Sequence, residues 1–137
     1  MDKYELIYSR LEKLIPDLTE LRPGDARKST SPGFMDLNLD VLSKDAEEMR
    51  IALAHNYISE GDVIADPDME IRVYLLPGWK RAEALTFQDG FGYREVYHEE
   101  NGQALVNVRA KGELNGFLKQ WLKNALDQGH RLAPSPG

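Results

Sequence analysis

Two arginines and a tyrosine fall on one face of the strands that the sequence predicts. Arg50 belongs to an alternating segment that ends at Tyr57, and Arg72 and Tyr74 belong to the next alternating segment. Guanidinium groups bind phosphate and carboxylate through paired hydrogen bonds. These three side chains therefore predict a site for a small anionic ligand.

Acidic residues on the same strands offer an alternative role for these arginines. Glu70, Asp40 and Glu95 occupy positions from which they can form cross-strand ion pairs with Arg72, Arg50 and Arg94. Such a pair contributes about 0.2–1 kcal/mol. The sequence leaves both interpretations open.

Three polar residues spaced by two, Asp36, Asn38 and Asp40, share one face of another predicted strand. Neighbouring carboxylates can bind a hard cation or act as an acid and base pair, and with His55 they suggest a metal-assisted hydrolase. The alternation of side chains places His55 on the opposite face, which argues against this hydrolase. The polar half of an ordinary strand has the same pattern.

A second acidic group, Asp62, Asp66 and Asp68, lies between two predicted strands. Its spacing lacks the glycine and glutamate of an EF-hand loop. It is typical of turn chemistry, with a cation site as the alternative.

Several chemistries are excluded by residue content. The chain has no cysteine, which excludes disulfides, thiolate metal sites and cysteine nucleophiles. Its three histidines do not have the spacing of a zinc site. No phosphate loop, dinucleotide fingerprint, nucleophile elbow or zinc-protease motif is present. We therefore predict no metal and no cofactor.

The overall charge bears on the class of partner. The formal net charge is −6 and the pI is about 5.1, which makes nucleic acid an unlikely partner. No apolar run reaches the ~20 residues of a membrane helix, so we expect no membrane. The charged start, with no apolar segment behind it, predicts no secretory signal and a cytoplasmic location.

Five or six consecutive strands are predicted from alternating apolar and polar residues. Their expected ranges are 35–41, 49–57, 69–75, 81–88, 93–98 and 104–109, the last being either a strand or an extended lead-in. Residues 16–34 are polar and rich in turn residues, which predicts a long connector that is mobile or forms a functional lid.

A helix is predicted at each end. The first has one apolar face from Tyr4 to Ile15 and ends at Pro16. The last has apolar residues at steps of three and four from Leu114 to Leu126, with Trp121 in the core stripe. Gly129 occupies the position of a left-handed cap. Residues 133–137 are expected to form a flexible tail after a single domain spanning 1–132.

The order of elements predicts an α+β fold, in which an antiparallel meander of five or six strands carries both terminal helices on one face. Two helices cover only one face of such a sheet, so the other is expected to be polar and open to water. The residues predicted on this outer face are Asp36, Asn38, Asp40, Arg50, Asn56, Glu70, Arg72 and Tyr74.

Two stretches carry a resemblance to a known family. They are Asp66-Pro-Asp-Met-Glu-Ile-Arg-Val-Tyr74 and Asn115-Gly-Phe-Leu-Lys-Gln-Trp-Leu122. Together they resemble the YqiB-like family of uncharacterised bacterial proteins, domain of unknown function 1249, from about Leu11 to His130. The resemblance implies a bacterial, cytoplasmic, single-domain protein. It also adds Asp66 to Arg50, Arg72 and Tyr74 as a candidate ligand-binding residue.

Three functions are consistent with the sequence. The first is a non-enzymatic binding or protein-interaction domain, for example a homodimer, that uses the open polar face. The second is a binder of small anionic ligands through Arg50, Arg72 and Tyr74. The third is the metal-assisted hydrolase, which is the least consistent with the strand pattern.

Overall fold

The computed structural model describes residues 1–134, so the last three residues of the expected tail lie outside the described part. Its elements are α1 Lys3–Leu14, a short 3-10 helix Leu18–Glu20, β1 Ala26–Ser29, β2 Asp36–Lys44, β3 Glu48–Ser59, β4 Asp62–Tyr74, β5 Ala82–Ala84, β6 Thr86–Asp89, β7 Gly92–Glu95, β8 Tyr97–Glu100, β9 Gln103–Val106 and α2 Val108–Asp127.

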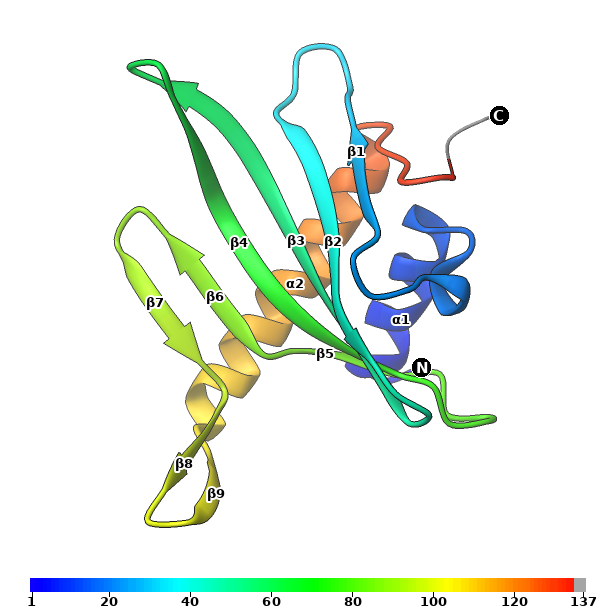
Figure 1. Cartoon of the computed structure of the whole chain (residues 1–137), viewed down its shortest axis with the longest axis vertical. Coiled ribbons are helices and arrows are strands. Elements are labelled where there is room, and N and C mark those ends of the chain that lie inside the picture. The colour runs from blue at the N-terminus through cyan, green and yellow to red at the C-terminus, as the bar shows by residue number, and fades with distance from the viewer. Residues whose placement is uncertain (135–137) are drawn as a thin grey trace.

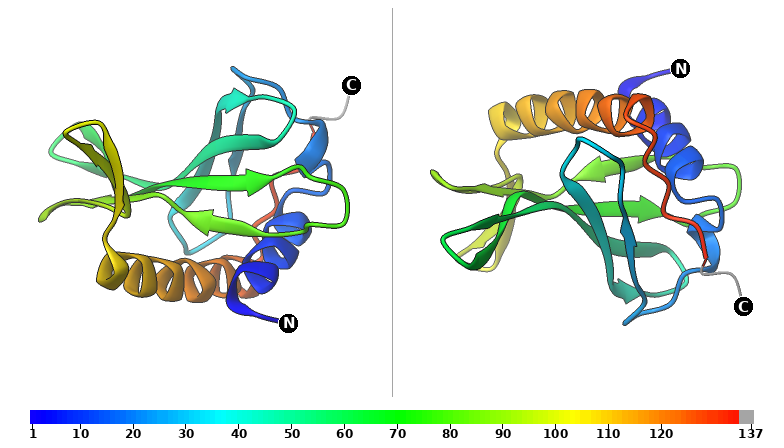
Figure 2. Two further views of the ribbon diagram at one scale, coloured as in Figure 1. Left: turned by 90° about the horizontal axis from the view of Figure 1, so that it is seen from below. Right: turned by 90° about the horizontal axis from the view of Figure 1, so that it is seen from above.

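The main sheet is antiparallel and has the order β1-β2-β3-β4-β6-β7, with β5 also paired to β4. Strands β8 and β9 form a separate hairpin. Figure 1 looks onto the sheet with both helices behind it, and Figure 2 shows the helices together on one side. This confirms the predicted α+β meander with terminal helices on one face.

The core lies between the helices and the inner face of the sheet. The odd-numbered residues from Met49 to Leu53 in β3 and from Met69 to Val73 in β4 are fully buried there. Trp121 of α2 is also buried, as the apolar stripe predicts. The buried side chain of Asn115 accepts a hydrogen bond from Ala84 N at 2.8 Å and so fastens α2 to β5.

Several expected boundaries were wrong. The connector 16–34 contains the 3-10 helix and edge strand β1, because its backbone pairs with Leu37 to Asp40 of β2. The turn expected around Asp66 is part of β4, which begins at Asp62 and extends the hairpin with β3. Helix α2 begins at Val108 and is capped by Asn107. The expected strand 104–109 is therefore shorter than predicted, and its first residues belong to β9.

Candidate binding face of the sheet

The two faces of β3 differ in the size and polarity of their side chains. Inner positions carry Ile51 and Leu53, whereas the outer positions between and beside them carry Arg50, Ala52 and Ala54. Two successive alanines leave the middle of the outer face without bulky side chains. The centre of the outer face therefore forms a depression, and longer side chains surround it.

Two adjoining hollows occupy this low region. One has a volume of about 210 Å³ and is lined by Arg50, Glu70, Arg72, Leu85, Thr86, Tyr93, Glu95 and Tyr97. The other has a volume of about 220 Å³ and is lined by Leu42, Ala52, Asp68, Glu70, Thr86, Gln88 and Tyr93. They share Glu70, Thr86 and Tyr93, and we call them together the sheet groove.

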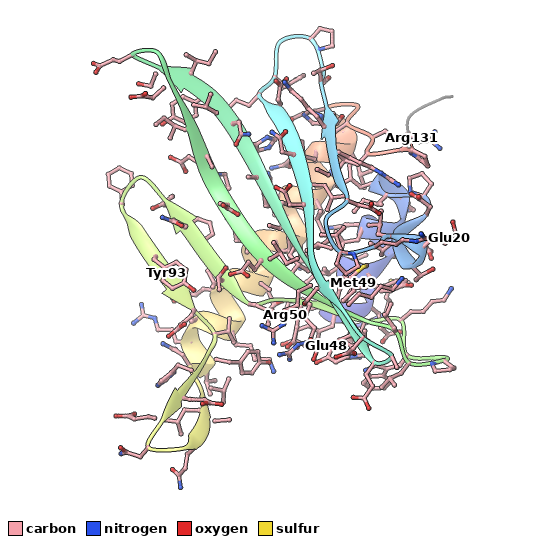
Figure 3. The ribbon with its side chains drawn as sticks, in the orientation of Figure 1. Glu20, Glu48, Met49, Arg50, Tyr93 and Arg131 are labelled. Carbon is pink, nitrogen blue, oxygen red and sulfur yellow. The ribbon has the colours of Figure 1, made fainter. Side chains whose placement is uncertain are left out.

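The β6–β7 hairpin supplies one wall of the sheet groove. Figure 3 places Tyr93 on this hairpin and Arg50 on the neighbouring part of the sheet. Each hollow is smaller than the ~300–1,000 Å³ of sites that enclose a drug-sized molecule. Each hollow by itself therefore suits a single side chain or a small charged group.

The two arginines predicted to act together do lie side by side. Arg50 and Arg72 are direct partners across β3 and β4. Their charges are already compensated, because Glu48 Oε2 lies 3.0 Å from Arg72 Nε and 3.5 Å from Arg50 Nε. Glu83 Oε1 lies 3.0 Å from Arg72 Nη1.

Arg72 is held firmly in this arrangement. Glu83 is buried and also accepts a hydrogen bond from the Tyr97 hydroxyl at 2.8 Å, and the Arg72 guanidinium lies 5.3 Å from the centre of the Tyr97 ring. Burial disfavours the charge of Arg72, but Tyr74, Glu48 and Glu83 outweigh this effect and raise its pKa. Arg72 therefore remains charged and serves first to neutralise Glu83.

The ion pairs differ from those considered from the sequence. Glu48 and Glu83 neutralise the arginines in place of Glu70 and Asp40. Arg94 pairs with Glu113 of α2 at 2.9 Å. Three acids on the lining, Asp68, Glu70 and Glu95, make no ion pair within residues 1–134.

These three acids give the sheet groove a surplus of negative charge. Burial raises the pKa of Asp68, and the charges of Glu70 and Asp40 raise it further. Burial also raises the pKa of the Tyr93 phenol, with additional contributions from Glu95 and Glu70. Both shifts reflect the cost of holding more negative charge in this partly buried region.

Tyr74 and Asp66 lie outside the lining of the sheet groove. Tyr74 is near the end of β4, opposite Glu48, and its phenol acts on the charge of Arg72. Asp66 accepts a hydrogen bond from Gly90 N at 3.4 Å and so connects the long β3–β4 hairpin to the β6–β7 turn. The structure thus brings Arg50 and Arg72 together and separates Asp66 from them.

The carboxylates and histidine of the hydrolase hypothesis lie on opposite faces. The Asp36 side chain pairs with Lys28 at 3.1 Å, whereas His55 is buried beside Trp121 on the inner face. Within the described residues, no group of three or more acidic or histidine side chains is arranged to hold a metal. Asp62 to Asp68 are spread along β4 and form no loop.

Sequence reasoning missed the parts of the sheet groove that come from distant segments. The sequence pattern did not indicate Tyr93 or Glu83, and it indicated Glu95 only as an ion-pair partner of an arginine, because only the folded hairpin and β5 bring these residues against β4. One local signal was present. The segment Ile51-Ala-Leu-Ala54 places the smallest side chains at two successive outer positions of a central strand.

Comparison with known proteins gives a family. A model described as Domain of unknown function (DUF6908) matches residues 9–131, which is most of the chain. The chain belongs to this family. The match supports an uncharacterised domain family, as the resemblance implied, although it is to DUF6908 and does not confirm the YqiB-like family.

Comparisons of this DUF6908 domain with curated proteins and with solved structures found no match. Among residues 1–134, no helix is both long and apolar enough to cross a membrane. The function must therefore be argued from the groove itself.

Proposed function

We propose that this DUF6908 domain is a non-enzymatic binding domain whose sheet groove receives a positively charged side chain of a partner protein. The observation that carries the proposal is that the sheet groove is lined by Asp68, Glu70 and Glu95, none of which forms an ion pair within residues 1–134. An ammonium or guanidinium group seated there would form charge-assisted hydrogen bonds with these carboxylates.

The electrostatics of the groove favour such a ligand. A bound cation would relieve the repulsion between Asp68 and Glu70, and binding would lower the pKa of Asp68. Tyr93 lines both hollows and is exposed, and cations are attracted to aromatic rings. The net charge of −6 also attracts basic partners over a longer range.

A titration followed by NMR tests this proposal. A short peptide that alternates lysine and alanine is added to the labelled protein at low salt, and the amide signals are recorded. We expect shifts concentrated at Ala52, Glu70, Thr86 and Tyr93, and weaker binding as salt rises. An acidic peptide of the same length should cause no such shifts.

A matched pair of variants makes the test specific. Glu70→Gln should weaken binding on the order of tenfold or more, because it removes a charge-assisted interaction. Glu12→Gln removes the same charge from the exposed side of α1 and should leave binding unchanged. Equal effects of both variants would show that only net charge matters and would contradict binding in the groove.

The small-anion function is the second candidate, because Arg50 and Arg72 lie together at one end of the sheet groove. Inorganic phosphate and citrate, titrated into the same protein, test it. Binding of either anion that disappears in Arg50→Ala would favour this candidate over the cation-binding proposal. Tyr74 would then act only through the charge of Arg72, and Asp66 only by connecting the β3–β4 hairpin to the β6–β7 turn. Neither side chain would touch the ligand.

We also propose a more specific family relationship for this chain. The strings around Arg72 and Trp121 support a relationship to the YqiB-like family, and hence a bacterial, cytoplasmic protein. A homodimer is the alternative use of the outer face. Sedimentation analysis tests this point, since a monomer at high concentration would leave the face free for another partner.

A further inference from the structure

The residues that follow α2 are hydrogen-bonded to the edge strand β1. Gly129 adopts a φ of +88°, which ends the helix and turns the chain toward β1. In Figure 1 the end of α2 and the segment that follows lie beside β1, and Figure 3 labels Arg131 there. We call residues 129–132 the terminal latch.

Backbone and side-chain hydrogen bonds hold the terminal latch. Arg131 N donates to Ser29 Oγ at 3.0 Å, and Leu132 N donates to Leu14 O at 2.8 Å. Arg27 donates to Leu132 O at 3.1 Å, and Leu132 is buried. The latch therefore joins α2, β1 and α1.

His130 is the buried centre of the terminal latch. Its side chain is 3% exposed, and its Nδ1 lies 2.9 Å from Ser29 Oγ. Its Nε2 has no hydrogen-bond partner within the described residues. A protonated imidazole has an N–H on both nitrogens, and burial in the closed latch disfavours its charge more than the Met35 backbone favours it.

His55 makes a charge on His130 still less favourable. The two imidazole rings have centroids 5.9 Å apart, and His55 is also buried against Trp121. Two imidazolium groups at this separation repel each other in a region from which water is largely excluded. His55 therefore adds to the cost of placing a charge on His130 in the closed latch.

Charged groups on β1, β2 and the latch itself lie around His130. Asp36 of β2 is the only acid that raises its pKa, and the Met35 backbone acts in the same direction. Burial and His55 outweigh them and lower the pKa of His130. Arg27 of β1 is engaged with Asp17, Lys28 points to the outer-face carboxylate Asp36, and Arg131 adds a further positive charge on the latch itself.

We propose that the terminal latch is an acid-sensitive switch, in which protonation of His130 beside His55 releases residues 129–132 from β1 and α1. The released state exposes the His130 imidazole to water, where its charge is solvated. Acid therefore shifts the population from the closed latch toward the open one without requiring the sheet to unfold. This inference does not depend on the sheet groove or on its ligand.

Hydrogen exchange measured on the whole protein at pH 7.5 and pH 5.5 tests the switch. The amides of Arg131 and Leu132 report on the latch, the amide of Leu53 reports on the sheet, and all rates are corrected for intrinsic exchange. Opening of the latch should become about tenfold more frequent at pH 5.5, as one histidine with an ordinary pKa in the open state requires. Protection of Leu53 should not change.

Two variants separate the switch from general acid weakening. His130→Gln can accept a hydrogen bond from Ser29 but cannot become charged, so its latch protection should be independent of pH. His55→Gln removes the neighbouring imidazole that disfavours a charge on His130, so the pH effect should be smaller. A tenfold change that persists in His130→Gln, or that appears equally at Leu53, would overturn the proposal.

A direct titration keeps the proposal testable if His130→Gln fails to fold. The ring signals of His130 in the unaltered protein are followed by NMR as the pH falls. The proposal requires titration below the ordinary histidine pKa of 6.5. Titration of His130 at or above this value would contradict it.

Discussion

The inner and outer faces of β3 use neighbouring residues for opposite purposes. Met49, Ile51 and Leu53 are fully buried against the helices, whereas Arg50 and Ala52 line an open groove. Burial of apolar surface stabilises the inner face, so its residues are constrained by packing. The outer face is freer to vary, which makes its small floor and surplus acids informative about binding.

The largest effect should come from breaking the inner face. Ile51→Ala should lower the free energy of unfolding by about 2–5 kcal/mol, because it leaves a cavity in the core. The outer-face change Ala52→Leu should alter stability by only about ±0.5 kcal/mol, yet fill the groove and abolish binding of the lysine peptide. Urea unfolding and the NMR titration measure the two results. A similar loss of stability in both variants would contradict the proposed difference between the faces.

The second effect concerns the border between the two environments. Arg72→Leu should lower the free energy of unfolding by about 2–3 kcal/mol, because it leaves buried Glu83 without its cation. This loss is somewhat smaller than the ~3–5 kcal/mol for breaking a fully buried ion pair. Arg50→Leu, at a more exposed position, should cost at most about 1 kcal/mol. Chemical denaturation of both variants checks the order, and a larger loss in Arg50→Leu would reverse our assignment of the structural arginine.

A third effect tests how the inner face is fastened to α2. Asn115→Ala should lower the free energy of unfolding by about 1–3 kcal/mol, since Ala84 N is then buried without an acceptor. The control is Gln120→Ala on the exposed side of the same helix, which should have little effect. Thermal unfolding distinguishes them, and an unchanged midpoint for Asn115→Ala would show that water replaces the amide.

The smallest effect concerns the charge of the sheet groove. The pKa of Asp68 is raised in the folded protein, so its ionised form is disfavoured by folding. Asp68→Asn should therefore raise the free energy of unfolding at pH 7, and the gain should vanish below the ordinary aspartate pKa of 3.8, where both states are neutral.

Asp45 provides a control of opposite sign for this pH dependence. Its carboxylate accepts hydrogen bonds from Glu47 N and Glu48 N, which lower its pKa. Asp45→Asn should reduce stability at pH 7 and have less effect as the pH falls below 3.8. Urea unfolding at several pH values measures both, and parallel curves for the two variants would contradict these assignments.

The amino-acid sequence by itself determined the local pattern of this protein. Alternation along 35–41 and 49–57 assigned Ile51 to the core and Arg50 to the outer face, because side chains of a strand point alternately to opposite faces. The spacing of Leu114, Trp121 and Leu122 determined the buried face of α2, and Gly129 marked its end. Both patterns involve only residues that lie close together in the sequence.

Only the tertiary structure decided which distant residues meet. The hairpin that brings Tyr93 and Glu95 beside Glu70, and the return of His130 to Ser29 and His55, depend on contacts between segments far apart in the chain. Such pairings leave no periodic trace in the sequence, since periodicity reports only which face a residue occupies. The groove and the terminal latch therefore became visible only when the sheet and helices were assembled.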